Sequence, residues 1–273
     1  MSTFFAANGI GVRNLHSFRL SSDGLAADRL VLSLPLAVNS SVLVADTLSE
    51  LAAPRSVSEA VTALFPHAHE LHVGHETHLG EVRWKVYLER RNGFEGEEPG
   101  TVFLAWKWKT ASQPIRSTYR WVPLGSTESR SSALGMALDD NPELKRVLVR
   151  VVDNMQLGRN CGAEFDRLVV REPSIQRVSV DIDTSTPRIP VGELTGLLDL
   201  ASALGLESDA IENELHAVRT NHIVRMAAGT SISGPFVTVY HQPFDTHHRH
   251  ASQAGSYSGR SQSDARKTPR ERQ

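Results

Sequence analysis

Eight segments between residues 70 and 241 alternate apolar and polar side chains with a period of two, which is the pattern of β-strands that bury one face. They form four pairs, and turn residues such as Leu79-Gly80 and Ser233-Gly234-Pro235 separate the partners. The pairs are 70–77 with 81–90, 101–109 with 117–123, 165–171 with 177–184, and 222–229 with 235–241, and a weaker pair is expected at 16–20 and 29–36. The sequence therefore predicts about ten antiparallel strands in hairpin units.

Amphipathic helices are predicted between the hairpins. The strongest begins at Asp140-Asn141-Pro142, where a capping side chain precedes a proline in the first turn, and it stops at Gly158. Two others are expected from about Val191 to Leu204 and after a cap at Ser208, and residues 46–65 should hold one or two more. Because each helix is apolar on one face only, each must pack on another element.

A long antiparallel sheet with helices on one face has two unpaired edges, and closing the sheet removes both. We therefore predict an α+β fold: an antiparallel β-barrel of about ten strands with helices packed outside. Residues 1–243 should form this single domain. Residues 244–273 hold six Lys/Arg, three Asp/Glu and almost no large apolar side chains, so we predict a disordered basic tail.

Composition narrows the class of protein. The formal net charge of −2 does not favour binding to nucleic acid or to a membrane surface. No segment approaches the roughly 20 apolar residues of a membrane-spanning helix. Cys161 is the one cysteine, which excludes an internal disulfide and fits a reducing compartment. We expect a cytoplasmic protein.

The polar faces of the predicted strands carry cations and tyrosines. These are Lys85 and Tyr87 in 81–90, Lys107 and Lys109 in 101–109, Arg167 and Arg171 in 165–171, and Tyr240 in 235–241. Since the helices should cover the apolar faces, we expect the polar faces to line the barrel interior. Converging cations could hold a diphosphate by charge-assisted hydrogen bonds, and aromatic rings could stabilise a carbocation.

Three stretches carry a family resemblance. A strand with an acidic residue, a turn and a basic strand with Lys-x-Tyr are predicted in HELHVGHETHLGEVRWKVYLE. A strand followed by a helix is predicted in RVSVDIDTSTPRIPVGELTGLLDLASALGL, and a closing hairpin in NHIVRMAAGTSISGPFVTVYHQP. Across residues 67–243 this pattern resembles the aromatic prenyltransferases of the ABBA barrel type, including those that modify cyanobactin-like peptides. The resemblance implies transfer of a prenyl group from a prenyl diphosphate to an electron-rich acceptor, which is an aromatic small molecule or a peptide side chain. It implies no certain cofactor, although Mg²⁺ could accompany the diphosphate.

The same resemblance assigns roles to particular residues. Glu76 matches the acidic position that orients or deprotonates the acceptor, and Lys85 and Tyr87 match the Lys-x-Tyr that holds the diphosphate and shields the cation. Further candidates for substrate binding, placed by strand position alone, are Lys107, Lys109, Arg171, Arg225 and Tyr240. Arg225 is out of phase with His222, so one of the two faces the helices unless a β-bulge intervenes.

Two alternatives stay open. The first is a barrel without catalytic activity that binds an anionic ligand or a peptide. The second is a metal-dependent enzyme, because five histidines lie between His67 and His78, and on a strand His72 and His78 would share a face with Glu76. No standard zinc spacing is present, so we assign no metal ligands from the sequence. The oligomeric state is not predicted.

Overall fold

The computed structural model describes residues 13–36, 41–78, 80–110, 112–123, 130–155, 167–175, 177–184 and 188–243. The predicted basic tail, residues 244–273, lies outside these ranges.

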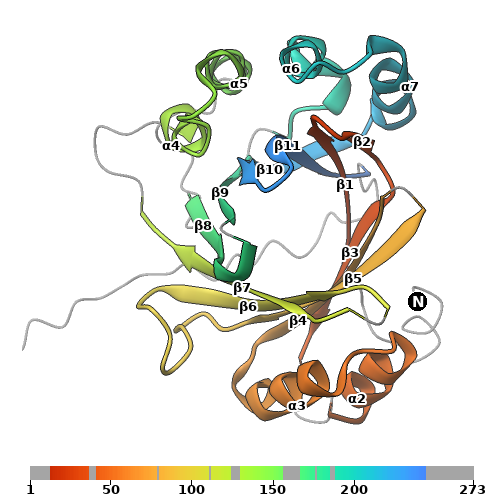
Figure 1. Ribbon diagram of the computed structural model, residues 1–273, viewed down its shortest axis with the longest axis vertical. Helices are drawn as coiled ribbons and strands as arrows, with labels where there is room; N and C mark the ends of the chain where they lie inside the picture. Colours follow the sequence, from red (N-terminus) through yellow and green to blue (C-terminus); the bar gives the residue numbers. More distant parts are fainter. Residues whose placement is uncertain are drawn as a thin grey trace, which may run out of the picture.

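Ten strands follow one another around a closed ring, and each pairs antiparallel with its neighbours (Figure 1). The strands are β1 (Arg13–Ser21), β3 (Arg29–Pro35), β4 (Glu70–His78), β5 (Glu81–Glu89), β6 (Thr101–Trp108), β7 (Ile115–Trp121), β8 (Arg167–Glu172), β9 (Arg177–Asp183), β10 (His222–Ser231) and β11 (Gly234–Gln242). Pairing of β11 with β1 closes the ring, and the short β2 (Gly24–Ala26) extends the sheet beside the end of β1. The predicted barrel of about ten strands is confirmed.

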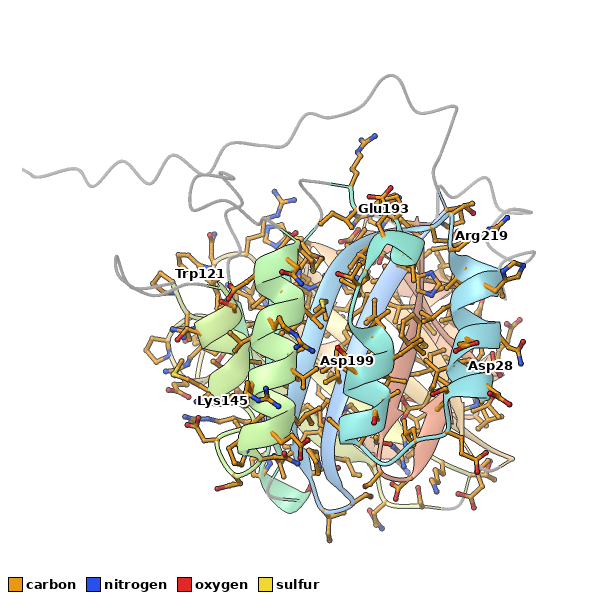
Figure 2. The ribbon with its side chains drawn as sticks, turned by 90° about the horizontal axis from the view of Figure 1, so that it is seen from above. Asp28, Trp121, Lys145, Glu193, Asp199 and Arg219 are labelled. Atoms are coloured by element: carbon orange, nitrogen blue, oxygen red, sulfur yellow. The ribbon has the colours of Figure 1, made fainter. Side chains whose placement is uncertain are left out.

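The helices lie outside the ring in two groups. They are α2 (Ser41–Glu50), α3 (Arg55–Leu64), α4 (Arg130–Met136), α5 (Pro142–Asn154), α6 (Leu197–Ala203) and α7 (Ser208–Val218), with 3₁₀ turns η1 (Phe65–His67), η2 (Pro173–Ile175) and η3 (Val191–Glu193). The first group, α2 and α3, packs on the apolar outer face of β3 to β6, and α4 to α7 pack on β9, β10, β11 and β1 (Figures 1 and 2). Within the described ranges, no helix has the length and hydropathy that a membrane span requires.

The predicted helices are present with two differences. At the strongest one, α5, the Asn141 side chain accepts a hydrogen bond from the Leu144 backbone at 3.1 Å, as a helix cap should. The single helix expected from Val191 to Leu204 is divided into η3 and α6, because Gly196 has a left-handed φ of 92° that interrupts the turn. Ser208 is the first residue of α7, and no side chain caps that helix.

A buried histidine on β11 should make the stability of the barrel depend on pH. His241 is 3% exposed, and its Nδ1 lies 3.0 Å from the Asn221 side-chain nitrogen. Burial, and then the nearby His16, lower the pKa of His241 from 6.5 to about 4. Between these values the unfolded chain binds a proton that the folded chain does not, so stability should fall as the pH drops from 6.5 towards 4.

Urea unfolding at pH 7.5 and pH 5 measures this loss. The variant His241→Asn, whose amide oxygen can replace Nδ1 as the acceptor, should lose less stability at pH 5 than the wild type does. The exposed His67 provides the control, because His67→Asn should keep the full pH dependence. An unchanged pH dependence in His241→Asn would contradict the assignment.

Candidate functional site

One end of the barrel interior forms a cavity of about 370 Å³, which is within the roughly 300–1,000 Å³ typical of small-molecule sites. Its aromatic lining consists of His72, Tyr87, Phe103, Tyr119 and Tyr240. Its charged lining consists of Arg13, Glu70, Glu89, Arg91, Asp181 and Arg225. The cavity therefore combines π-faces with both signs of charge.

Three tyrosines meet in this cavity from three separate strands. The rings of Tyr87 and Tyr119 meet edge to face with centroids 5.7 Å apart, and Phe103 packs against Tyr119 at 5.9 Å. Burial, and then the proximity of Tyr240, raise the pKa of Tyr87, so its phenol stays protonated at neutral pH. The sequence reasoning missed Tyr119 because the cations beside it, Arg116 and Arg120, lie on the opposite face of β7.

Arg225 and Asp181 form an ion pair at the cavity wall. A β-bulge between Ile223 and Arg225 restores the phase of β10, so Arg225 lies opposite Tyr240 on the inner face. Arg225 Nε donates to Asp181 Oδ1 at 2.7 Å, while Nη2 is buried without a hydrogen-bond partner among the described residues. Burial raises the pKa of Asp181, although the charge of Arg225 opposes the rise.

Glu76 lies further along β4 than the cavity-lining residues and is surrounded by cations. Its carboxylate is 3.2 Å from Arg29 Nε and 2.8 Å from Arg83 Nη1, and it accepts a hydrogen bond from Lys85 Nζ. Burial alone would raise the pKa of Glu76, but the charges of Lys85, Arg29 and Arg83 hold it well below the usual range. A carboxylate so firmly ionised is a weak base. The geometry pairs Glu76 with three cations, and its role in orienting or deprotonating an acceptor stays a prediction.

The lysines of β5 and β6 also have acidic partners. Lys85 and Lys107 lie opposite each other and are both buried, and Lys107 forms an ion pair with Glu172. Burial, and the charges of Arg29 and Lys107, lower the pKa of Lys85 although Glu76 opposes the effect. Lys109 follows the end of β6, is 38% exposed and pairs with Glu81, so it does not line the cavity.

The inward orientation predicted for Arg171 is wrong. Arg171 lies on the outer face of β8, half exposed and 3.3 Å from Glu98, while Leu168 on the alternate face lines the cavity. The prediction assumed that helices cover every apolar face. In the described part of the chain, the helices lie over other strands than β7 and β8 (Figure 1), so here the apolar face turns inward and the arginine faces outward.

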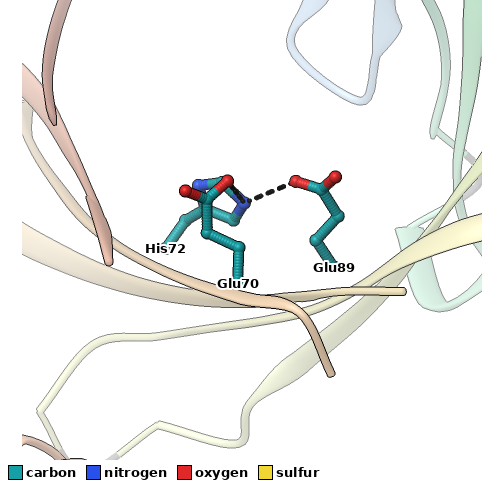
Figure 3. Close-up of side chains that lie close together, drawn as sticks. All are labelled: Glu70, His72 and Glu89. Atoms are coloured by element: carbon teal, nitrogen blue, oxygen red, sulfur yellow. Dashed lines mark hydrogen bonds and ion pairs between the residues drawn. The ribbon is translucent and has the colours of Figure 1, made fainter. Parts of the chain in front are cut away.

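Glu70, His72 and Glu89 stand together at the cavity (Figure 3). His72 Nε2 is 3.2 Å from Glu89 Oε2 and 3.7 Å from Glu70 Oε2, and its Nδ1 is 2.8 Å from Ser33 Oγ. His72 is thus grouped with these two carboxylates and not with Glu76, the partner that its strand face suggested. Glu70 and Glu89 were not singled out in the sequence, where they lie 19 residues apart.

No family model and no curated protein sequence matches this chain. Solved structures do match it. The apo form of the prenyltransferase PriB aligns with a TM-score of 0.53 and 15% identity, over 84% of this chain and 79% of that chain. The chain shares the fold of the ABBA prenyltransferase barrels.

Two further structures with this prenyltransferase barrel are similar. One is 5-dimethylallyltryptophan synthase from Streptomyces coelicolor, which aligns with a TM-score of 0.49 and 16% identity over 85% of this chain and 80% of that chain. The other is AnaPT from Neosartorya fischeri, which aligns with a TM-score of 0.49 and 12% identity over 84% of this chain and 77% of that chain. Identities this low relate the folds and not the chemistry, so the function of this chain has to be argued from its own cavity.

Proposed function

We propose that the barrel transfers a prenyl group from a prenyl diphosphate to an electron-rich acceptor, which is an aromatic small molecule or a peptide side chain. The observation that supports this most strongly is the meeting of three tyrosines with a buried guanidinium that has an unused donor. The reaction needs two things from such a cavity: donors for a leaving diphosphate and π-faces for a carbocation.

The leaving group would bind to the cationic side of the interior. Five cations, Arg29, Arg83, Lys85, Lys107 and Arg225, face four carboxylates, Glu76, Glu172, Asp181 and Asp183, which leaves an excess of one positive charge. Arg225 lies at the cavity wall and can direct Nη2 to a diphosphate oxygen. Such donors favour heterolysis of the C–O bond, in which the electron pair leaves with the diphosphate.

The tyrosines would protect the allylic cation that this heterolysis leaves. A ring face attracts a cation through its quadrupole without forming a bond. The raised pKa of Tyr87 is important here, because a neutral phenol is a much weaker nucleophile toward the cation than a phenolate is. The acceptor carbon would then attack the cation and form the new C–C bond.

We assign the proton released by the acceptor to Asp181. This carboxylate lines the cavity, and its raised pKa makes it a stronger base than Glu76, whose pKa is lowered. Arg225 orients Asp181 through its Nε and would hold the diphosphate through Nη2, so one side chain positions both partners of the reaction.

A second candidate is a barrel that binds an anionic ligand or peptide and catalyses no reaction. The arginines of the cavity lining, Arg13, Arg91 and Arg225, favour it, because they can hold an anion without any reaction. Formation of a prenylated product from dimethylallyl diphosphate and an aromatic acceptor separates the two. Binding of the diphosphate without turnover across indole and phenol acceptors would favour the second candidate.

Replacing Arg225 with glutamine should weaken binding of dimethylallyl diphosphate by about 10–100-fold, because a charge-assisted hydrogen bond is worth roughly 1.5–3 kcal/mol. Titration calorimetry with dimethylallyl and geranyl diphosphates measures the loss. Arg171→Gln is the matched control: it removes the same side chain from the outer face of the barrel and should bind like the wild type. Equal affinities for all three proteins would place the diphosphate elsewhere.

A further inference from the structure

The three side chains at the cavity are brought together by strand register. Glu70 lies directly opposite Glu89 across β4 and β5, and His72 is two residues along β4 on the same face. One oxygen or nitrogen atom from each residue lies within 4.8 Å of the other two. Figure 3 shows the three side chains projecting from neighbouring strands, with the His72 imidazole facing Glu89. The backbone pairing of β4 with β5 therefore holds Glu70, His72 and Glu89 next to one another.

Ser33 contacts the second ring nitrogen of His72. Ser33 Oγ lies 2.8 Å from His72 Nδ1, and when Nδ1 donates to this hydroxyl, Nε2 keeps its lone pair. Nε2 then faces two carboxylate oxygens that can only accept. Two arrangements satisfy these groups: a hydrogen on Nε2 that donates to Glu89, or a metal ion among the three side chains. Hydrogen bonds of the Ser33 type orient metal-binding imidazoles in proteins.

The spacing of the ligand atoms suits a metal ion. Bonds of about 2.0–2.2 Å from a tetrahedral ion to nitrogen and oxygen place neighbouring ligand atoms about 3.3–3.5 Å apart. The distances from His72 Nε2, 3.2 Å to Glu89 and 3.7 Å to Glu70, lie on either side of this value. One imidazole with two carboxylates suits Mn²⁺ or Zn²⁺ better than Mg²⁺, which prefers oxygen ligands alone.

We propose that Glu70, His72 and Glu89 bind one divalent transition-metal ion at the cavity, with an open coordination position directed at an anionic oxygen of the cavity ligand. Arg13, which now pairs with Glu70, is 71% exposed and can turn into solvent when the ion binds. Three protein ligands leave at least one position free, which is the arrangement of metal sites that act on a substrate. The metal site does not depend on prenyl transfer.

Titration of Mn²⁺ into the full chain, followed by the electron paramagnetic resonance signal of the free ion, tests the site. The wild type should bind about one equivalent of Mn²⁺, and the signal of the free ion should fall by that amount. Glu89→Gln should weaken binding by at least about tenfold, and Ser33→Ala by about 10–100-fold, as is typical when a partner of a ligating histidine is lost. His75→Gln is the control on the same strand, because the His75 ring packs on Trp84 and not among the three groups, and it should bind like the wild type.

Two results would overturn the proposal. One is that folded wild type leaves the Mn²⁺ signal unchanged up to millimolar concentrations, and the other is that Glu89→Gln binds Mn²⁺ as tightly as His75→Gln. In either case a hydrogen on Nε2 joins His72 to Glu89 and no metal ion binds among the three groups. Circular dichroism checks the fold of each variant, and Ser33→Ala serves as the test if Glu89→Gln does not fold. Because the probe is the metal alone, failure of prenyl transfer leaves the result unaffected.

Discussion

Replacing Lys107 with methionine should destabilise the protein by about 3–5 kcal/mol, although methionine is the more apolar side chain. Lys107 is 5% and Glu172 1% exposed, so the substitution removes the ammonium group from an ion pair inside the barrel. Removal of one partner from a buried ion pair costs more than the pair itself contributes, because the remaining charge has lost its hydration. Urea unfolding at pH 7.5 measures the difference.

Lys109→Met is the matched control for this experiment. Lys109 is two residues away, carries the same charge and also pairs with a glutamate, but both side chains are exposed. Exposed ion pairs contribute about 0–1 kcal/mol, so the control should unfold almost like the wild type. The double variant Lys107→Met/Glu172→Met should recover much of the lost stability because it removes both charges of this pair. Similar losses for Lys107→Met and Lys109→Met would show that Lys107 is solvated.

The barrel could be predicted because its strands are local hairpins. The period of two, interrupted by turn residues, identifies β4 with β5 and β10 with β11 from adjacent stretches of sequence. Closure followed from the need to remove sheet edges, and it required no knowledge of which side chains meet across the ring. The inward orientation of Lys85 and Tyr87 followed from the apolar alternate face, which helices do cover.

The charge pairing inside the barrel could not be predicted in the same way. Lys107 and Glu172 are 65 residues apart and come from strands that are not adjacent, so no sequence spacing connects them. Strand faces identified the interior cations but not their counter-ions, so the ion pairs of Glu76 with Arg29, Arg83 and Lys85 were not predicted. Arg171 was misplaced for a related reason, because its orientation depends on which strands the helices cover, and among the described residues these are not β7 and β8.

Replacing Asp181 with asparagine should lower the turnover number for prenyl transfer by about 10²–10⁴-fold, the usual contribution of a general base. Asparagine keeps the oxygen that accepts from Arg225 Nε, so the fold and the guanidinium should stay in place. Loss of the negative charge beside Arg225 should leave binding of dimethylallyl diphosphate unchanged or tighter. The variant would then bind the diphosphate and fail to prenylate the acceptor.

The dependence of turnover on pH provides the second measurement. A base acts when it is deprotonated, so turnover by the wild type should fall as the pH drops through the raised pKa of Asp181. That acidic limb should be absent from the residual activity of Asp181→Asn. Glu76→Gln is the comparison, because a counter-ion outside the cavity lining should affect stability more than the chemical step. If Asp181→Asn keeps its turnover while Glu76→Gln loses it, the proton is accepted at Glu76 and the assignment to Asp181 is wrong.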